Sequence, residues 1–352
     1  MQDLYPEKAE RQKRFYYSDK KGVALIKIKG LAYEGLPGLK PLDQWDFPAE
    51  KFEYYRAKGI KEDAYRAARL GINDDWIPTI CPFYGVAEHT AFLGGEVVLA
   101  PTTSYNHNVL DFEDIYKIKL DPDNEWLKMV IDGMNYYREN YSESFFTKLR
   151  GASGISDIAY VLRGNDLYLD VYDEPDEILK LADFCAAAAK FYIDAQRKAA
   201  TRVAGGLVCS QDCWMPENSA GHISEDGACL MNEDIYSEFF MPALLKLCEN
   251  YSDILLHTHT VGAHQLNNFM KIPNLKIINL VGDPNADTAI NTMRKNSDLF
   301  GNVIIDLLMT KDEIMQNLDI LSEHKTIISC NIKDAKEANE LAGYVNGKLG
   351  GF

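Results

Sequence analysis

The chain has 352 residues, 46% of them hydrophobic, and a formal net charge of −16. This size suffices for a large core in one domain or two. The negative charge argues against nucleic acid and anionic membranes as partners, because both attract lysine and arginine rather than carboxylates. No run of roughly 18 apolar residues occurs and the first residues carry no apolar signal core, so we expect a cytoplasmic protein. The seven scattered cysteines fit free thiols in a reducing compartment.

Residues 1–75 are rich in aromatic side chains but lack regular periodicity, so we expect an irregular N-terminal cap beside the core. A strand-like run at 78–81 follows, and Tyr84 and His89 come shortly after it. We assign both side chains to substrate binding, as walls of a pocket. The alternative is that they only pack the cap.

A long helix is predicted from Glu174 to Ala200, because proline and acidic residues occupy its first turn. A strand at 205–209 follows, so the loop at 211–227 is expected at the mouth of the core. We assign Trp214 in this loop to substrate binding. Three acids of the loop are candidates for a general acid or for orienting a ligand histidine, although each alone is more often a solvated carboxylate: Asp212, Glu225 and Asp226.

The second half of the chain alternates between strand-like and helix-like segments. Strands are predicted at 254–257, 275–281, 302–307 and 326–329, and helices at 262–270, 287–296, 311–322 and 334–345. This alternation is typical of repeated βα units. No glycine fingerprint of a doubly wound nucleotide-binding fold occurs. We therefore predict an α/β fold, a (β/α)8 TIM barrel that forms one domain over residues 1–352 with the cap at its start.

The predicted strand at 254–257 leads into two histidines one residue apart. Alternation along a strand places His257 and His259 on the same side of the backbone, at the edge where barrel enzymes build their sites. Cys330 directly follows the strand-like run at 326–329. We therefore expect its thiol at the same edge of the sheet, as a third candidate ligand. Two imidazoles and a thiolate are a plausible zinc site. The alternatives are histidines that bond loop carbonyls and a cysteine buried as a small apolar side chain.

Two further residues belong to this predicted site. Asp283 follows the strand at 275–281 and could supply a fourth metal ligand, or that position could be left to the substrate. His264 lies about one helical turn beyond His259, and we assign it to substrate binding.

Several segments resemble the uroporphyrinogen decarboxylase superfamily. The resemblance extends over roughly residues 75–350 and begins in the segment 155–186. It continues in the runs Phe239-Phe-Met-Pro-Ala-Leu, Leu256-His-Thr-His-Thr-Val-Gly, Gly301-Asn-Val-Ile-Ile-Asp-Leu-Leu and Ile328-Ser-Cys-Asn-Ile-Lys-Asp. The resemblance implies the same barrel fold. It also implies one of two activities, porphyrinogen decarboxylation or zinc-dependent methyl transfer between corrinoid proteins and thiols.

The residues favour the methyltransferase branch. Arg66 and Arg69 stand without the arginine-rich motif that is known to receive the substrate carboxylates in the decarboxylases. The zinc triad of the methyltransferases, which this chain resembles in part, is His-x-Cys followed by a distant Cys. Here His257 and Cys330 match the first and last positions, whereas His259 puts an imidazole in the middle.

We therefore expect a zinc-dependent methyltransferase of this superfamily. It would move a methyl group between a corrinoid carried by a partner protein, or a methylated small molecule, and a thiol or similar acceptor. A small-molecule substrate and a homodimer are the further partners expected. Two alternatives remain open: a decarboxylase-like lyase acting on a non-porphyrin molecule, and a noncatalytic barrel that binds a ligand.

Overall fold

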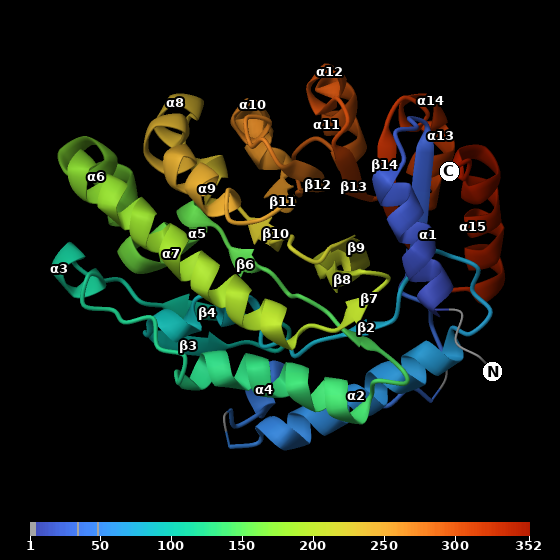
Figure 1. The fold of residues 1–352 in the computed structure, drawn as a ribbon, viewed down its shortest axis with the longest axis horizontal. Helices are drawn as coiled ribbons and strands as arrows, with labels where there is room; N and C mark the ends of the chain where they lie inside the picture. The colour runs from blue at the N-terminus through green and yellow to red at the C-terminus, as the bar shows by residue number, and fades with distance from the viewer. Residues whose placement is uncertain (1–4, 34, 48) are drawn as a thin grey trace.

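The computed structural model describes residues 5–33, 35–47 and 49–352 (Figure 1). Residues 1–4, 34 and 48, which belong to the expected N-terminal cap, lie outside this part of the chain. At the centre is a parallel seven-stranded sheet with the order β1-β14-β13-β12-β11-β10-β6. These strands are β1 (Val23–Lys29), β6 (Ala152–Ser153), β10 (Gly221–Ser224), β11 (Ile254–His259), β12 (Leu275–Val281), β13 (Ile304–Leu308) and β14 (Lys325–Asn331).

The expected barrel is present in part. The short strand β5 (Phe146–Thr147) precedes β6 in the chain. It pairs in parallel with β2 (Thr79–Ile80), outside the main sheet. The backbone N–H of Asp75, just before β2, donates to the Ile26 carbonyl at 2.7 Å, at the free edge of β1. Within the described residues the strand ladders do not close into a barrel, so the arrangement is a mixed α/β fold compatible with a TIM-barrel-like one.

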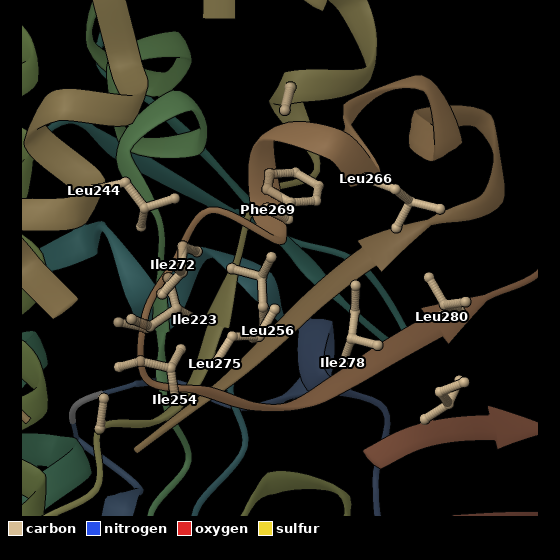
Figure 2. Close-up of a cluster of buried hydrophobic side chains, with 14 of the residues drawn as sticks. Ile223, Leu244, Ile254, Leu256, Leu266, Phe269, Ile272, Leu275, Ile278 and Leu280 are labelled. Atoms are coloured by element: carbon tan, nitrogen blue, oxygen red, sulfur yellow. The ribbon is translucent and has the colours of Figure 1, made fainter. Parts of the chain in front are cut away.

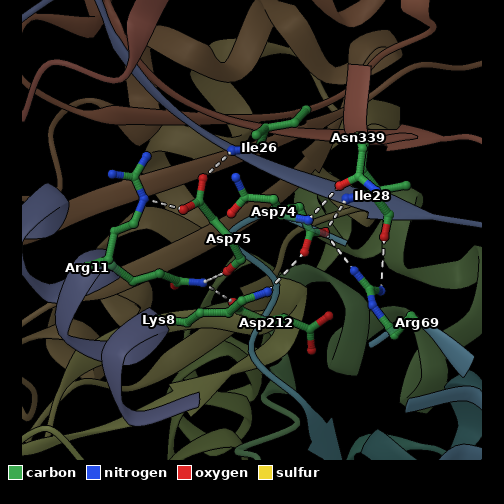
Figure 3. A network of polar contacts seen from close by, with 11 residues as sticks. Lys8, Arg11, Ile26, Ile28, Arg69, Asp74, Asp75, Asp212 and Asn339 are labelled. Carbon is green, nitrogen blue, oxygen red and sulfur yellow. Dashed lines mark hydrogen bonds and ion pairs between the residues drawn. The ribbon is translucent and has the colours of Figure 1, made fainter. Parts of the chain in front are cut away.

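Between the edge of β1 and the segment just before β2, side-chain hydrogen bonds replace the backbone hydrogen bonds of a strand ladder. The carboxylate of Asp75 accepts the backbone N–H of Ile26 at 2.9 Å, and that of Asp74 accepts the N–H of Ile28 at 2.8 Å (Figure 3). Both acids are also paired with cations: Asp74 with Lys8 and Arg69, and Asp75 with Arg11. The edge of β1 therefore has no unsatisfied donor at these two positions.

Helices follow the strands along their outer side (Figure 1). Those of the second half are α7 (Pro175–Ala199), α8 (Glu233–Ile235), α9 (Met241–Cys248), α10 (Leu266–Phe269), α11 (Ala289–Lys295), α12 (Ser297–Phe300), α13 (Lys311–Gln316), α14 (Leu318–Leu321) and α15 (Ala335–Leu349). Those of the first half are α1 (Tyr5–Tyr17), α2 (Lys51–Ala68), α3 (Phe112–Ile115), α4 (Glu125–Asn140), α5 (Ile155–Arg163) and α6 (Leu167–Asp173). In the part of the chain that the structure describes, none of the helices has both the length and the apolar character that crossing a bilayer requires.

Side-chain alternation along the strands separates two cores. In β11, Ile254 and Leu256 pack outward against helix residues such as Leu244 and Phe269 (Figure 2). Leu255 points to the other face, where it joins the inward residues of the neighbouring strands, Ile277, Ile304 and Ile327. Each buried side chain of this size contributes roughly 1.5–3 kcal/mol. His257 and His259 continue the inward face of Leu255.

Two expectations about the elements are wrong. The segment expected to be an irregular cap contains β1, which pairs with β14 inside the main sheet. The predicted strand at 205–209 is β8 (Gly206–Cys209), which lies in a small antiparallel sheet between β7 (Arg202–Val203) and β9 (Cys213–Pro216). A tight turn with positive φ at both Ala204 and Gly205 joins β7 to β8, as in a two-residue hairpin. The strand of the main sheet is instead β10, within the predicted loop.

Candidate metal and substrate site

A cavity of about 690 Å³ lies where the carboxyl ends of β6, β10 and β11 meet. Ser153, Ser224 and His257 reach it from these three strands. The hairpin of β3 (Glu96–Leu99) and β4 (Ser104–His107) and the helix α5 supply other parts of the wall. This is the end of a barrel-like fold at which ligands and catalytic groups are usually found.

Three side chains at or beside this cavity could hold a metal ion: Asp226 and His257 line it, and His259 follows His257 at the end of β11. One ligand atom each from Asp226, His257 and His259 lies within 4.8 Å of the others. Oδ1 of Asp226 is 3.5 Å from Nε2 of His257 and 3.8 Å from Nε2 of His259. Oδ1 is also buried without a hydrogen-bond partner among the described residues. A buried carboxylate oxygen between two imidazole nitrogens fits a divalent ion such as zinc, which would satisfy all three atoms.

The neighbours of His257 determine which of its nitrogens is free. Nδ1 lies 2.6 Å from Oδ1 of Asn279, and Nδ2 of Asn279 donates to the Asp306 carboxylate at 2.9 Å. The carboxylate can only accept, so it fixes the Asn279 amide with its oxygen toward the histidine. Nδ1 of His257 therefore carries the proton, and Nε2 presents a lone pair toward Asp226.

Asp283 acts on His259 in the same way. Its Oδ1 accepts from Nδ1 of His259 at 2.7 Å, and its Oδ2 accepts from the backbone N–H of Val261 at 3.2 Å. Although burial works against ionisation, the hydrogen bond from His259 holds the pKa of Asp283 below its usual value. The structure thus places Asp283 behind the imidazole, where such carboxylates orient metal-binding histidines, and not in the predicted fourth ligand position.

The third member of the predicted triad, Cys330, lies away from the two histidines. Its side chain is fully buried in the core between the sheet and the helices, with Ile28 and residues of α15 such as Leu341. Burial raises the pKa of the thiol to about 11. Ser329 and Asn331, not Cys330, continue the inward face marked by Ile327. The structure brings His257 and His259 together with Asp226, which we had considered as a general acid.

The other two predicted acids lie away from the cavity wall. Glu225 is fully buried and accepts the backbone N–H groups of Ile155 and Ser156, so it caps the start of α5. Asp212 binds Thr79 and Lys148, at 2.5 and 2.8 Å, and lines a separate cavity of about 240 Å³. Burial alone would raise the pKa of Asp212, but Lys148, Lys29 and Lys27 hold it well below its usual range. Neither acid is placed to act on a molecule in the larger cavity.

Of the four predicted substrate-binding residues, only His89 lines the larger cavity. Tyr84 is buried in an aromatic cluster against Tyr54 and Phe47. Trp214 packs against the rings of α1, and its Nε1 donates to the Val203 carbonyl at 3.0 Å. His264 bonds the Met231 carbonyl through Nε2 at 2.9 Å. Tyr84 and Trp214 thus lie away from this cavity, because a strand-like run alone does not tell at which end of the fold its aromatic neighbours lie.

His222 and Arg150 also line the cavity. We expected no role for Arg150, and His222 was expected only as part of the loop at 211–227 at the mouth of the core. Burial, followed by the charges of His257 and His89, holds the pKa of His222 well below its usual value. Burial likewise lowers the pKa of His89, with Arg150 adding to the effect. The available signal was the alternation in Gly221-His-Ile-Ser224, where His222 and Ser224 share one face, but four residues are too few to stand out as a strand.

Comparison with known proteins supports the fold. No family model and no curated protein sequence matches the chain. Among solved structures, a methyltransferase from Methanosarcina mazei is similar over 97% of this chain and 98% of that one, with a TM-score of 0.61 and 14% sequence identity. At this identity the similarity establishes a shared architecture along nearly the whole chain.

Proposed function

We propose that the chain is a metal-dependent methyltransferase, with zinc held by Asp226, His257 and His259. The observation that carries the proposal is Oδ1 of Asp226, which has no hydrogen-bond partner among the described residues and lies 3.5 and 3.8 Å from Nε2 of His257 and His259. The fold shared with a methyltransferase from Methanosarcina mazei supports the same class of activity.

The roles of the chain's own residues follow from their contacts. Asn279 and Asp283 hold the two imidazoles with Nε2 toward Asp226, which would supply the negative ligand. Three protein ligands leave a position for a molecule from the cavity, as in catalytic zinc sites. When bound there, zinc would supply a Lewis acid that lowers the pKa of a thiol or similar acceptor. The methyl donor in this proposal is a corrinoid carried by a partner protein, or a methylated small molecule.

The test combines metal content with turnover. We expect about one zinc per chain in the purified protein, and methyl transfer from methylcobalamin to a thiol that stops when a chelator removes the metal. The variant His259→Ala should lose both zinc and transfer, whereas Cys330→Ala should keep both. Equal transfer by the metal-free and the zinc-loaded protein would overturn the proposal, and so would full zinc content in His259→Ala.

A further inference from the structure

The wall next to the proposed metal ligands carries imidazole nitrogens that have no hydrogen-bond partner in the described part of the chain. His89 is 8% exposed, and its Nδ1 has no hydrogen-bond partner among the described residues. Both ring nitrogens of His222 are buried and likewise lack a partner in the described ranges. Both rings line the cavity of about 690 Å³. Buried polar atoms are normally paired, so unpaired ones around a cavity indicate that a ligand supplies the partner.

These two rings are not a second metal site. Within the described part of the chain, the one group of three or more His, Cys, Asp or Glu with ligand atoms close enough to share an ion is Asp226, His257 and His259. The ring of His222 lies beside that of His257, with centroids 5.1 Å apart and the planes tilted by 53°, but its nitrogens do not join the group. His89 and His222 are therefore available to an organic molecule.

Arg150 adds a positive charge to the same wall. Its Nε donates to Oε1 of Glu88 at 2.7 Å, and its guanidinium lies over the Phe83 ring with 4.8 Å between carbon and centroid. Oε2 of Glu88 accepts the backbone N–H of Tyr84 at 2.7 Å, so both carboxylate oxygens are engaged. These contacts fix the plane of the guanidinium and leave it further N–H groups, in the fork that matches a carboxylate.

Much of the rest of the cavity wall is apolar, although polar side chains such as Asn106, Ser153 and Asp157 also line it. Side chains of Val86, Val109, Val161, Leu230, Tyr160 and Tyr168 supply an apolar and aromatic lining. A cavity of this size and composition fits a small organic molecule with an apolar body. One polar group at its end would meet the two histidines and Arg150.

We propose that the cavity binds a small organic acid whose carboxylate is held by Arg150, His89 and His222, with its apolar body against the aliphatic and tyrosine wall. The inference deepens the proposed function, and rests on it for the claim that the bound molecule is the substrate. Arg150 supplies the charge complement, and each imidazole supplies a donor to the carboxylate oxygens. The apolar lining selects against acids without a hydrophobic body.

The test is a calorimetric titration of the zinc-loaded protein with three matched probes: 3-phenylpropionate, 3-phenylpropanol and 3-phenylpropylamine. The acid should bind at least about 10-fold tighter than the alcohol, the difference expected for one charge-assisted hydrogen bond. The amine should bind most weakly. His222→Ala and His89→Asn should each lower the affinity for the acid by about 10-fold and leave that for the alcohol unchanged.

His264→Ala is the matched control, because His264 lies outside the cavity and should leave all three affinities as they are. Equal binding of acid and alcohol would overturn the inference, as would an equal loss of acid binding in His264→Ala and His222→Ala. Metal content of the same samples separates the two proposals. Acid binding with the expected histidine pattern in a protein without zinc would refute the proposed function alone. Zinc binding without acid preference would refute the inference alone.

Discussion

The aspartates at the edge of β1 and the single Asp226 beside the cavity make opposite use of a carboxylate. At the edge of β1, Asp74 and Asp75 each accept a backbone N–H and bind cations, so the network in Figure 3 is closed. Just beyond the end of β10, Asp226 keeps Oδ1 buried between two imidazoles, with no hydrogen-bond partner among the residues that the structure describes. The first arrangement stabilises the fold, whereas the second holds an unsatisfied atom that a ligand can satisfy. Whether a carboxylate oxygen has a partner therefore distinguishes structural from functional acids, whereas residue type does not.

The largest loss of stability is expected in the hydrogen-bond and ion-pair network of Asp74 and Asp75. Asp74→Ala would leave Arg69, which is 4% exposed, and the Ile28 N–H without their partner. We expect the free energy of unfolding to fall by about 3–5 kcal/mol, because one partner of a buried ion pair is removed. Urea unfolding measures it. Asp319→Ala, which removes the exposed ion pair with Arg294, is the control and should change little. A similar loss in both variants would refute the structural role of the network.

Asp226→Ala should behave in the opposite way. Because Oδ1 has no hydrogen bond to lose, the unfolding free energy of the metal-free protein should stay within about 0.5 kcal/mol of the wild type. Zinc affinity should fall by more than about 100-fold, beyond the loss typical of residues that only orient a ligand. Competition with a metal chelator gives the affinity. Unchanged zinc affinity would remove Asp226 from the site.

A smaller effect is expected behind His259. Asp283→Asn keeps the shape of the side chain but loses the carboxylate that accepts from Nδ1. Zinc affinity should fall by about 10- to 100-fold, the range for partners of metal-binding histidines. Asp287→Asn, in the same loop and paired with Lys295 on the surface, should leave the affinity unchanged. If Asp283→Asn abolished binding as completely as Asp226→Ala, Asp283 would be a ligand and not an orienting residue.

The smallest effect is expected at Cys330. Its thiol packs against the helix layer, so Cys330→Ala should cost about 1 kcal/mol of stability, the typical value for a point substitution. Zinc content should not change. Loss of zinc in this variant, measured by elemental analysis, would restore the thiolate to the site.

The sequence predicted the second half of the fold well because buried parallel strands need continuous apolar runs. The predicted strand at 275–281 is β12 without change, and the helix from Glu174 to Ala200 differs from α7 by one residue at each end. The same feature caused the error at Cys330. In Thr326-Ile-Ile-Ser-Cys330 both faces carry apolar or small side chains, so the pattern does not reveal which face is inward.

All three proposed ligands were among the predicted site residues, but Asp226 was expected as a catalytic acid and Cys330 was expected beside the histidines. The strand that positions Asp226, β10, has only four residues, and the hairpin strand β8 before it has the more apolar sequence. We therefore took β8 for the strand of the main sheet and did not expect Asp226 directly after a strand. The partners that fix the imidazoles, Asn279 and Asp283, come from the next strand and its exit. Their register against β11 depends on how neighbouring strands pair, including an irregularity between Ile254 and Leu255. A single sequence does not specify that register.

X-ray absorption at the zinc edge, on protein purified without added thiols, tests the central claim most directly. The account predicts only nitrogen and oxygen ligands at about 2.0–2.2 Å, from two imidazoles, one carboxylate and solvent. A sulfur ligand at about 2.3 Å would contradict it, because it would place a cysteine at the metal where the structure places Asp226.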